Sequence, residues 1–320
     1  MTAEPLLLDP VLAPGRLHVR LIVNPTVSRL RDGQVEAVIR ALEPAFHVSS
    51  AHTEAAGHAT ELAREAAEDG CAVVAVLGGD GTVSQAASGL VGSQTAMACL
   101  PAGVTDVFAR AIGTPRDPVA AAERLAAMER PRIRIVDVGT VNGRHFLYTA
   151  GVGFTATMTR AAHRTPHRKA TLGQLHFAAA GVSEIVGTYL RNPPRMRLQA
   201  DGFYAEGVTA VVQNCRALTY FGPREIRLCG EAGLDTGMLS VTSLERGRPG
   251  VVANVVARLV LGGSESLPGK AGIDAASSVR ELVVTPLDGG VLPVDGDGEY
   301  LGESDRIVFG VEPAALRVVS

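Results

Sequence analysis

The motif Gly78-Gly79-Asp80-Gly81-Thr82 directly follows an apolar run, residues 72–77. An unbroken apolar run of this length is typical of a strand buried on both faces of a parallel sheet. In α/β folds the loop after such a strand lies at the carboxyl edge of the sheet, where ligands bind. The glycines allow backbone N–H groups to approach phosphate oxygens, and the carboxylate of Asp80 could hold magnesium or a hydroxyl group. The junction therefore predicts a nucleotide-phosphate loop, and an ordinary glycine turn is the simpler alternative.

Length, composition and charge restrict the class of protein. The 320 residues suffice for two domains with separate cores, and 46% hydrophobic against 20% charged residues indicates a globular chain. A net charge of −3 argues against a nucleic-acid partner. The cysteines form no C-x-x-C pair, so we expect neither disulfides nor zinc; they are Cys71, Cys99, Cys215 and Cys229. Without a signal-peptide pattern or a spanning apolar segment, we expect a cytoplasmic protein that meets lipid only from the surface.

The pattern of elements changes near Pro131. Strands and helices alternate over residues 17–131, which predicts a Rossmann-like parallel sheet with helices on both faces. From residue 132 to 305 strands dominate, with a strong hairpin turn at Asn142-Gly143, which favours a mostly antiparallel β-sandwich. Residues 1–16 form an N-terminal extension. We therefore predict an α/β domain followed by a β-sandwich domain.

Two more loops are expected at the carboxyl edge of the first sheet. Asn24-Pro25 ends the first strand, and is either a nucleotide contact or simply a turn. The segment 101–110 follows another strand, with Gly103 for close backbone approach and Thr105 and Asp106 as polar groups. Thr and Asp are also common helix caps, so a routine cap is the alternative reading of this loop.

Further charged and apolar segments have competing interpretations. His163 and His167 have metal-ligand spacing, but the intervening Pro166 breaks the helix they would need, so we reject zinc. The basic cluster of residues 160–169 is either a solvated face or a contact for anionic head groups. The apolar helix expected over 250–261 favours core packing over a lipid-facing role, and another helix is expected over 170–190.

Asp297-Gly298-Glu299 lies in a stretch rich in glycine and aspartate. Such residues are most often solvated turn residues. The Asp-x-Asp spacing also suits a calcium loop, but the helix-loop-helix pattern is absent. The residues alone thus favour a turn over a catalytic base at Glu299.

These motifs, in this order, resemble the diacylglycerol kinase catalytic-domain family, which also includes sphingosine, ceramide and bacterial lipid kinases. The resemblance extends from about Leu17 to Val319. The Gly-Gly-Asp-Gly-Thr loop matches the family signature, and Asp-Gly-Glu matches the motif that carries its proposed general base. The matching segments are Asn24-Pro25, Thr53 with Gly57-His58-Ala59, residues 78–82, 101–110, 151–156 and 234–239, and Asp297-Gly298-Glu299.

The resemblance implies an ATP-dependent lipid kinase that transfers the γ-phosphate to diacylglycerol or a related long-chain lipid. It implies ATP in a cleft between two domains, with the C-terminal segment 306–320 returning to the nucleotide domain. Glu299 would be the base, and Asp80 would position Mg²⁺ or the acceptor hydroxyl. The residues so assigned to ATP are Asn24, Pro25, Thr53, Gly78, Gly79, Asp80, Gly81, Thr82, Gly103, Thr105 and Asp106. Thr53 is also expected to cap a helix over residues 54–68.

The chain departs from the family pattern at four polar positions. Val104 replaces a hydroxyl residue, for which Thr105 could substitute, and Asp106 replaces asparagine. Thr155 stands where the motif Gly-Phe-Asp-Ala has aspartate. Thr236 replaces the second aspartate of Asp-Asp-Gly, a ligand of a structural magnesium in bacterial members, which leaves Asp235 as a candidate ligand.

Two other functions remain open. The glycine loop is shared with NAD kinases, so a kinase with a soluble acceptor is one alternative. The four departures motivate the second, a catalytically weakened nucleotide-binding regulatory protein. The expected partners are a lipid substrate at the membrane surface, met peripherally, and a second copy of the chain, since an exposed sandwich edge could form a homodimer.

Overall fold

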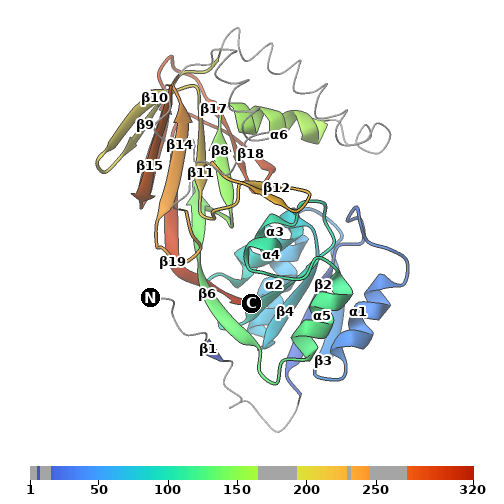
Figure 1. Cartoon of the computed structure of the whole chain (residues 1–320). Coiled ribbons are helices and arrows are strands. Elements are labelled where there is room, and N and C mark those ends of the chain that lie inside the picture. Colours follow the sequence, from blue (N-terminus) through green and yellow to red (C-terminus); the bar gives the residue numbers. More distant parts are fainter. Residues whose placement is uncertain (1–5, 8–15, 165–192, 229–231, 246–271) are drawn as a thin grey trace. The chain divides into compact units, whose positions relative to one another are not determined.

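The computed structural model describes residues 6–7, 16–164, 193–228, 232–245 and 272–320 (Figure 1). The chain divides into two compact units, residues 1–138 with 313–320 and residues 139–312. The sequence placed these boundaries at 131/132 and 305/306. Strands β6 (Arg132–Val141) and β19 (Ile307–Val319) run through both boundaries and contribute to both units. The helices expected over 170–190 and 250–261 lie outside the described residues.

The first unit contains the predicted parallel sheet. Its strand order is β19, β5, β4, β2, β3, and β1 (Leu6–Leu7) pairs with β6. All six residues of β4 are buried, as the apolar run predicted, because β2 and β5 flank this strand and helices cover both faces. The bounds of the other strands are β2 (His18–Val23), β3 (His47–His52), β4 (Val73–Gly78) and β5 (Ala96–Pro101).

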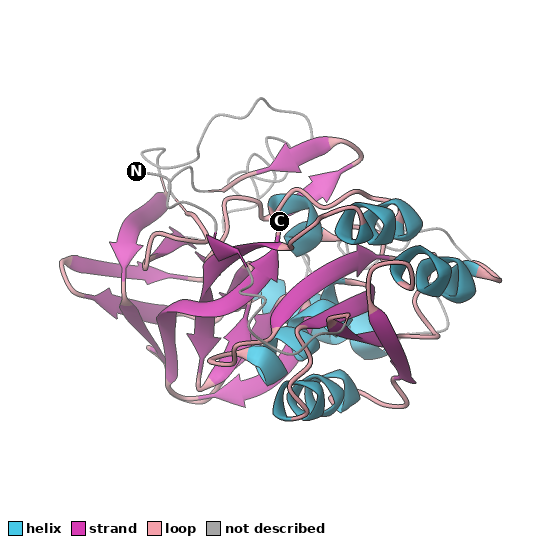
Figure 2. Cartoon of the chain, turned by 90° about the horizontal axis from the view of Figure 1, so that it is seen from below, coloured by secondary structure: helices cyan, strands magenta, loops and turns pink. Residues whose placement is uncertain are grey.

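Helices lie on both sides of this sheet (Figure 2). One layer consists of α1 (Gln34–Leu42) and α5 (Pro118–Ala126), whose apolar side chains share a core with β2, β4 and β5. The other consists of α2 (His58–Glu68) and α3 (Asp80–Leu90), which pack closely together. A Cβ atom at Gly89 would collide with the carbonyl oxygen of Thr60, so this close approach requires glycine. A short helix, α4 (Val107–Ala111), follows β5.

The expected helix over residues 54–68 begins later than the sequence predicted. α2 starts at His58, and Gly57 precedes it in the left-handed conformation with φ 88°. Thr53 is therefore not its N-cap; its backbone N–H donates to the carbonyl oxygen of Val23 at 2.9 Å. Glycine adopts the left-handed conformation most easily, which explains why the turn before α2 ends at Gly57. The helix ends at Glu68, close to the predicted bound, and Gly70 then adopts a left-handed conformation with φ 72°.

The second unit is antiparallel, as predicted. One sheet has the order β15, β14, β11, β8, β17, β18, and strands β10, β9, β16 and β19 form another run. Apolar side chains from both pack into one core, which is the sandwich arrangement. The bounds are β7 (Arg144–Phe146), β8 (Thr149–Val152), β9 (Met196–Ala200), β10 (Phe203–Gly207), β11 (Thr209–Gln213), β12 (Thr219–Phe221), β13 (Arg224–Ile226), β14 (Leu239–Leu244), β15 (Ile273–Val279), β16 (Glu281–Pro286), β17 (Leu292–Gly296) and β18 (Glu299–Ser304).

The helix of this unit, α6 (Phe154–Arg164), follows β8 directly. It packs against β8, β17 and β18. None of the described helices combines the length and apolar character that crossing a bilayer requires.

Candidate active site

The loops assigned to ATP meet at one edge of the first sheet. β2, β3, β4 and β5 are parallel, so the segments that follow them all leave from the carboxyl edge, as predicted. Asn24 joins two of these loops, because its amide nitrogen donates to Thr82 Oγ1 at 2.9 Å. Its Oδ1 accepts from the backbone N–H and the hydroxyl of Thr26, at 3.0 and 2.9 Å. Asn24 and Thr82 thus hold the loops together.

Glycine backbones from β4 and β5 are in direct contact at this edge. A Cβ atom added to Gly79 would lie 3.3 Å from the Cα of Gly103, and one added to Gly103 would lie 2.8 Å from the Cα of Gly79. A Cβ atom at Gly78 would lie 2.7 Å from the Cβ of Thr82. Neither loop therefore has room for side chains here. The backbone surface that results can approach phosphate oxygens closely.

Helix α3 begins inside the glycine motif. Gly79 precedes it in an extended conformation, and no side chain caps its first turn. The free N–H groups and the helix dipole make such an N-terminus favourable for an anion. Asp80 is the first residue of α3, but its carboxylate does not cap these N–H groups. It accepts instead from the Thr105 hydroxyl at 2.8 Å and from the Phe108 N–H at 3.4 Å.

Asp106 forms the turn that leads into α4. It is 4% exposed and adopts the left-handed conformation, with φ 46° and ψ 51°. Asparagine and aspartate tolerate this conformation better than most residues. Its Oδ1 accepts from the Gly103 N–H at 2.9 Å. The departure from asparagine therefore keeps the local geometry and adds a carboxylate.

The carboxylates of Asp80, in α3, and Asp106, before α4, repel one another. Burial raises the pKa of Asp80, and hydrogen bonds from Thr105 and the start of α4 oppose the shift. Burial, and then the charge of Asp80, raise the pKa of Asp106 to about 6, against the lowering effects of the Gly103 N–H, Arg29 and Arg116. A cation at this position would relieve the repulsion.

Magnesium fits these residues only together with a phosphate ligand. Mg²⁺ in nucleotide sites is commonly held by one or two carboxylates plus phosphate oxygens, and Asp80 with Asp106 provides such a pair. Within the described part of the chain, no group of three or more His, Cys, Asp or Glu side chains could hold a metal ion. The protein side of a magnesium site here is therefore incomplete without the nucleotide.

The predicted structural magnesium site at Asp235 lacks, among the residues that the structure describes, a pair of carboxylates like that of Asp80 and Asp106. Asp235 and Thr236 are exposed, and the Thr236 hydroxyl contacts the carbonyl oxygens of Gly233 and Met238 at 3.1 and 3.0 Å. It also accepts from the Met238 N–H at 3.2 Å, so it closes its own turn. The described residues around Asp235 do not form a cation site, and its role as a ligand stays a prediction.

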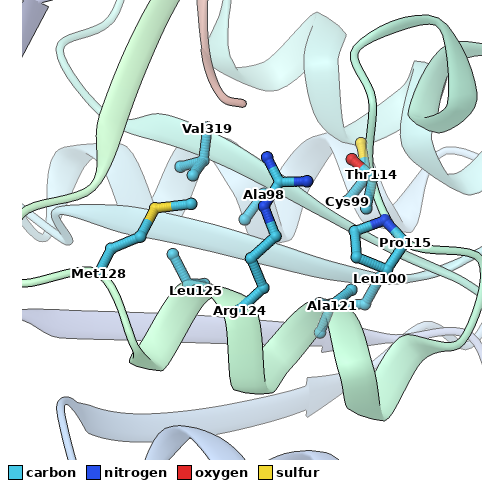
Figure 3. A pocket seen from close by; sticks show the side chains of 10 residues that line it. All are labelled: Ala98, Cys99, Leu100, Thr114, Pro115, Ala121, Arg124, Leu125, Met128 and Val319. Carbon is cyan, nitrogen blue, oxygen red and sulfur yellow. The ribbon is translucent and has the colours of Figure 1, made fainter.

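A small cavity of the first unit lies between β5 and α5 (Figure 3). Its lining is mostly apolar, and the guanidinium of Arg124 donates to the Gly113 carbonyl oxygen at 2.7 Å. No residue assigned to ATP or catalysis lines it. The cavity is thus separate from the predicted nucleotide loops.

In the second unit, Asp297 of the Asp-Gly-Glu motif has a structural role. It is 4% exposed, and its carboxylate accepts from the N–H groups of Leu147, Tyr148 and Thr149 at 2.6, 3.0 and 3.1 Å. Its own N–H donates to the Thr149 carbonyl oxygen at 2.7 Å. These bonds fix the turn between β17 and β18 to the bend before β8.

Glu299 follows this turn as the first residue of β18. It is half-buried and pairs with Gly296 of β17. Glu299 belongs to the second unit and Asp80 to the first, so the residues assigned to catalysis come from both units. The clamp at Asp297 explains how the backbone beneath Glu299 is held in place.

The comparisons with known proteins decide the family. The chain is 32% identical over 266 residues to a protein of Pseudomonas aeruginosa (strain UCBPP-PA14) named "Probable lipid kinase YegS-like", covering 82% of this chain and 81% of that one. It is 30% identical over 238 residues to a "Diacylglycerol kinase" of Bacillus subtilis (strain 168), covering 72% and 74%. Residues 18–157 match the family model described as the diacylglycerol kinase catalytic domain. The chain belongs to the diacylglycerol kinase catalytic-domain family.

The fold agrees with this membership. A crystal structure of a diacylglycerol kinase from Bacillus anthracis (strain Sterne) superimposes with a TM-score of 0.68 at 21% identity, covering 94% of this chain and 96% of that one. The two-domain architecture is therefore that of diacylglycerol kinases. At this identity the likeness concerns the fold.

Sequence reasoning missed three contacts of this lipid kinase family member. They are the Asn24–Thr82 bond, the three-fold clamp on Asp297, and a bond between Thr155 and Asp295. The Asp297-Gly298 dipeptide is a turn signal that could have indicated a fixed corner, and both residues have positive φ. The other contacts join residues far apart in sequence and carry no local signal.

Proposed function

We propose that this chain is an ATP-dependent lipid kinase that transfers the γ-phosphate to a hydroxyl group of diacylglycerol or a related long-chain lipid. The observation that carries the proposal is the backbone contact between Gly79 and Gly103, beside the uncapped start of α3. Membership of a lipid kinase family supports the choice of acceptor class.

The triphosphate would bind on the backbone of residues 78–82 and Gly103. Asn24, Pro25, Thr53 and Thr105 would surround it, with Asn24 acting through its bond to Thr82. Asp80 and Asp106 would hold Mg²⁺ together with phosphate oxygens, and the ion would neutralise phosphate charge. Thr105 places a hydroxyl next to the exposed Val104, although that hydroxyl already donates to Asp80.

Glu299 would act on the acceptor. Its carboxylate would orient the lipid hydroxyl and accept its proton as the hydroxyl oxygen bonds to the γ-phosphorus and the bond to ADP breaks. Phosphoryl transfer depends mainly on in-line positioning and charge neutralisation, so a strongly basic carboxylate is not required. The Asp297 clamp supports this role because it fixes the backbone that carries Glu299.

The test is phosphate transfer from labelled ATP with magnesium onto lipids in mixed micelles. The panel contains diacylglycerol, sphingosine, ceramide and a total lipid extract, and parallel reactions contain NAD or a polyol without detergent. The proposal expects label in a lipid that disappears when magnesium is chelated. Label in NAD or the polyol alone would support a soluble acceptor, and ATP binding without any transfer would support a regulatory protein.

The same proposal places the chain peripherally at a membrane surface. Sedimentation with vesicles of phosphatidylglycerol and diacylglycerol tests this association, and no binding with or without ATP would contradict it. An exposed edge of the sandwich is where a second copy would pair. Analytical ultracentrifugation tests that homodimer.

A further inference from the structure

The Thr155 hydroxyl and the Asp295 carboxylate meet between α6 and β17. Thr155 Oγ1 donates to Asp295 Oδ1 at 2.9 Å, and the hydroxyl of Thr159, one turn further along α6, donates to the Thr155 carbonyl oxygen at 3.1 Å. Asp295 is 5% exposed. A carboxylate buried this deeply needs hydrogen-bond donors to replace its lost hydration. The contact is therefore part of the interior of the unit.

Strand β8 leaves room for this contact. Gly151 of β8 pairs with Asp295 of β17. A Cβ atom at Gly151 would collide with Thr155 Oγ1 and lie 2.8 Å from Asp295 Oδ1. Any larger residue at position 151 would thus separate α6 from β17. The glycine of β8, the threonine of α6 and the aspartate of β17 thus fit together at one point.

The contact connects α6 to the hairpin that carries Glu299. In that hairpin Asp295 pairs with Tyr300, and Gly296 pairs with Glu299. On the same helix, Arg160 donates to Glu303 at 2.6 Å, and its guanidinium carbon lies 6.0 Å from the centre of the Tyr300 ring. Helix α6 is therefore attached to both strands of the hairpin (Figure 1).

The hydroxyl of Thr155 suits the Asp295 carboxylate better than a second carboxylate would. Burial, opposed by the Thr155 bond, raises the pKa of Asp295 to about 6, and the charge of Asp297 adds to the shift. The family motif has aspartate at position 155. An aspartate at that position would place two carboxylates in contact, whereas threonine offers Asp295 a donor.

We propose that Asp295 is a positioning residue that, through Thr155, docks α6 on the β17–β18 hairpin and so fixes the direction of Glu299. It supplies from β17 the carboxylate that the family motif carries on the helix. The departure at Thr155 is then compensated and does not weaken the enzyme. This inference rests on the proposed function, because it concerns turnover through Glu299.

The test exchanges the two side chains. The variants are T155D, D295T and the double variant T155D/D295T, with T157V as the matched control. Thr157 lies on the same helix, and its hydroxyl donates only locally, to the Gly153 carbonyl oxygen at 2.8 Å. Each single variant should lower kcat by about 10-fold or more with KM for ATP changed less than about twofold, and the double variant should recover to within about threefold of the parent. T157V should leave kcat unchanged.

A second readout needs no substrate. Hydrogen exchange of residues 154–164 and 292–304 should rise in T155D and D295T, and return in the double variant. Unchanged exchange in both single variants would overturn the docking itself, even if no lipid is phosphorylated. With an active parent enzyme, a D295T variant with parental kcat, or a folded double variant no better than its worse single variant, would overturn the positioning role and leave the lipid kinase function standing.

Discussion

The hydroxyl of Thr105 donates to the Asp80 carboxylate at 2.8 Å, which joins the loop after β5 to the first residue of α3. This bond explains why Asp80 does not cap its own helix. The start of α3 stays open toward the glycine surface, and the carboxylate is held beside Asp106. A loop that seemed to depart from its family at Val104 thus uses the neighbouring hydroxyl to orient the motif aspartate.

Replacing Thr105 by valine should misalign Asp80. The Thr105→Val variant removes the hydroxyl donor, so Asp80 keeps only backbone N–H contacts at the start of α4, such as that of Phe108 at 3.4 Å. We expect kcat to fall by about 10-fold and stability to change by less than about 1 kcal/mol. The control is Ser88→Ala on α3, whose hydroxyl donates to Ser84 at 3.0 Å. Equal kcat values for the two variants would contradict the role of Thr105.

Replacing Asp106 by asparagine should stabilise the protein at neutral and alkaline pH. The pKa of Asp106 is raised to about 6 by burial and by Asp80, so folding is penalised once this carboxylate ionises. The penalty is absent below pH ~4 and complete above pH ~7, where Asp106→Asn should add up to about 3 kcal/mol. Asparagine also retains the oxygen that accepts from Gly103.

Urea unfolding of both proteins at pH 4 and pH 8, without magnesium, measures this difference. The variant's advantage should appear only at pH 8. A stabilisation of the same size at both pH values would show that charge is not its cause.

Replacing Asp297 by alanine should destabilise the second unit. The change leaves three buried or half-buried N–H groups without their acceptor. We expect a loss of about 2–4 kcal/mol, measured by chemical unfolding, and a lower kcat because the turn before Glu299 loosens. Asp288→Asn, at a side chain 63% exposed, is the control. A loss no larger than in that control would contradict the clamp.

The local parts of the fold and site could be predicted from sequence. The apolar run 72–77 and the glycines after it determine a buried strand and a tight loop, so β4 and its loop were located correctly. The start of α2 was less predictable, because Thr53 is a common capping residue but the left-handed conformation of Gly57 delays the helix to His58. The domain boundaries predicted at 131/132 and 305/306 lie just before β6 and just before β19, whereas the division into two units falls inside these strands, at 138/139 and 312/313.

The supporting contacts could not be predicted, because they depend on pairs distant in sequence. Asp297 binds residues 147–149, and Thr155 binds Asp295 across 140 positions. Read singly, Asp295 and Asp297 resemble solvated turn residues. Both are buried in the structure, and their donors come from α6, for Asp295, and from residues 147–149, for Asp297.

The most direct measurement compares Glu299→Gln with Glu281→Gln, a matched change at an exposed residue of β16. Lipid phosphorylation and ATP binding are measured for both variants and the parent. If Glu299 orients the acceptor hydroxyl and accepts its proton, Glu299→Gln should lower kcat by about 100-fold or more with ATP affinity within about twofold, and Glu281→Gln should match the parent. A Glu299→Gln variant with parental kcat would contradict the account.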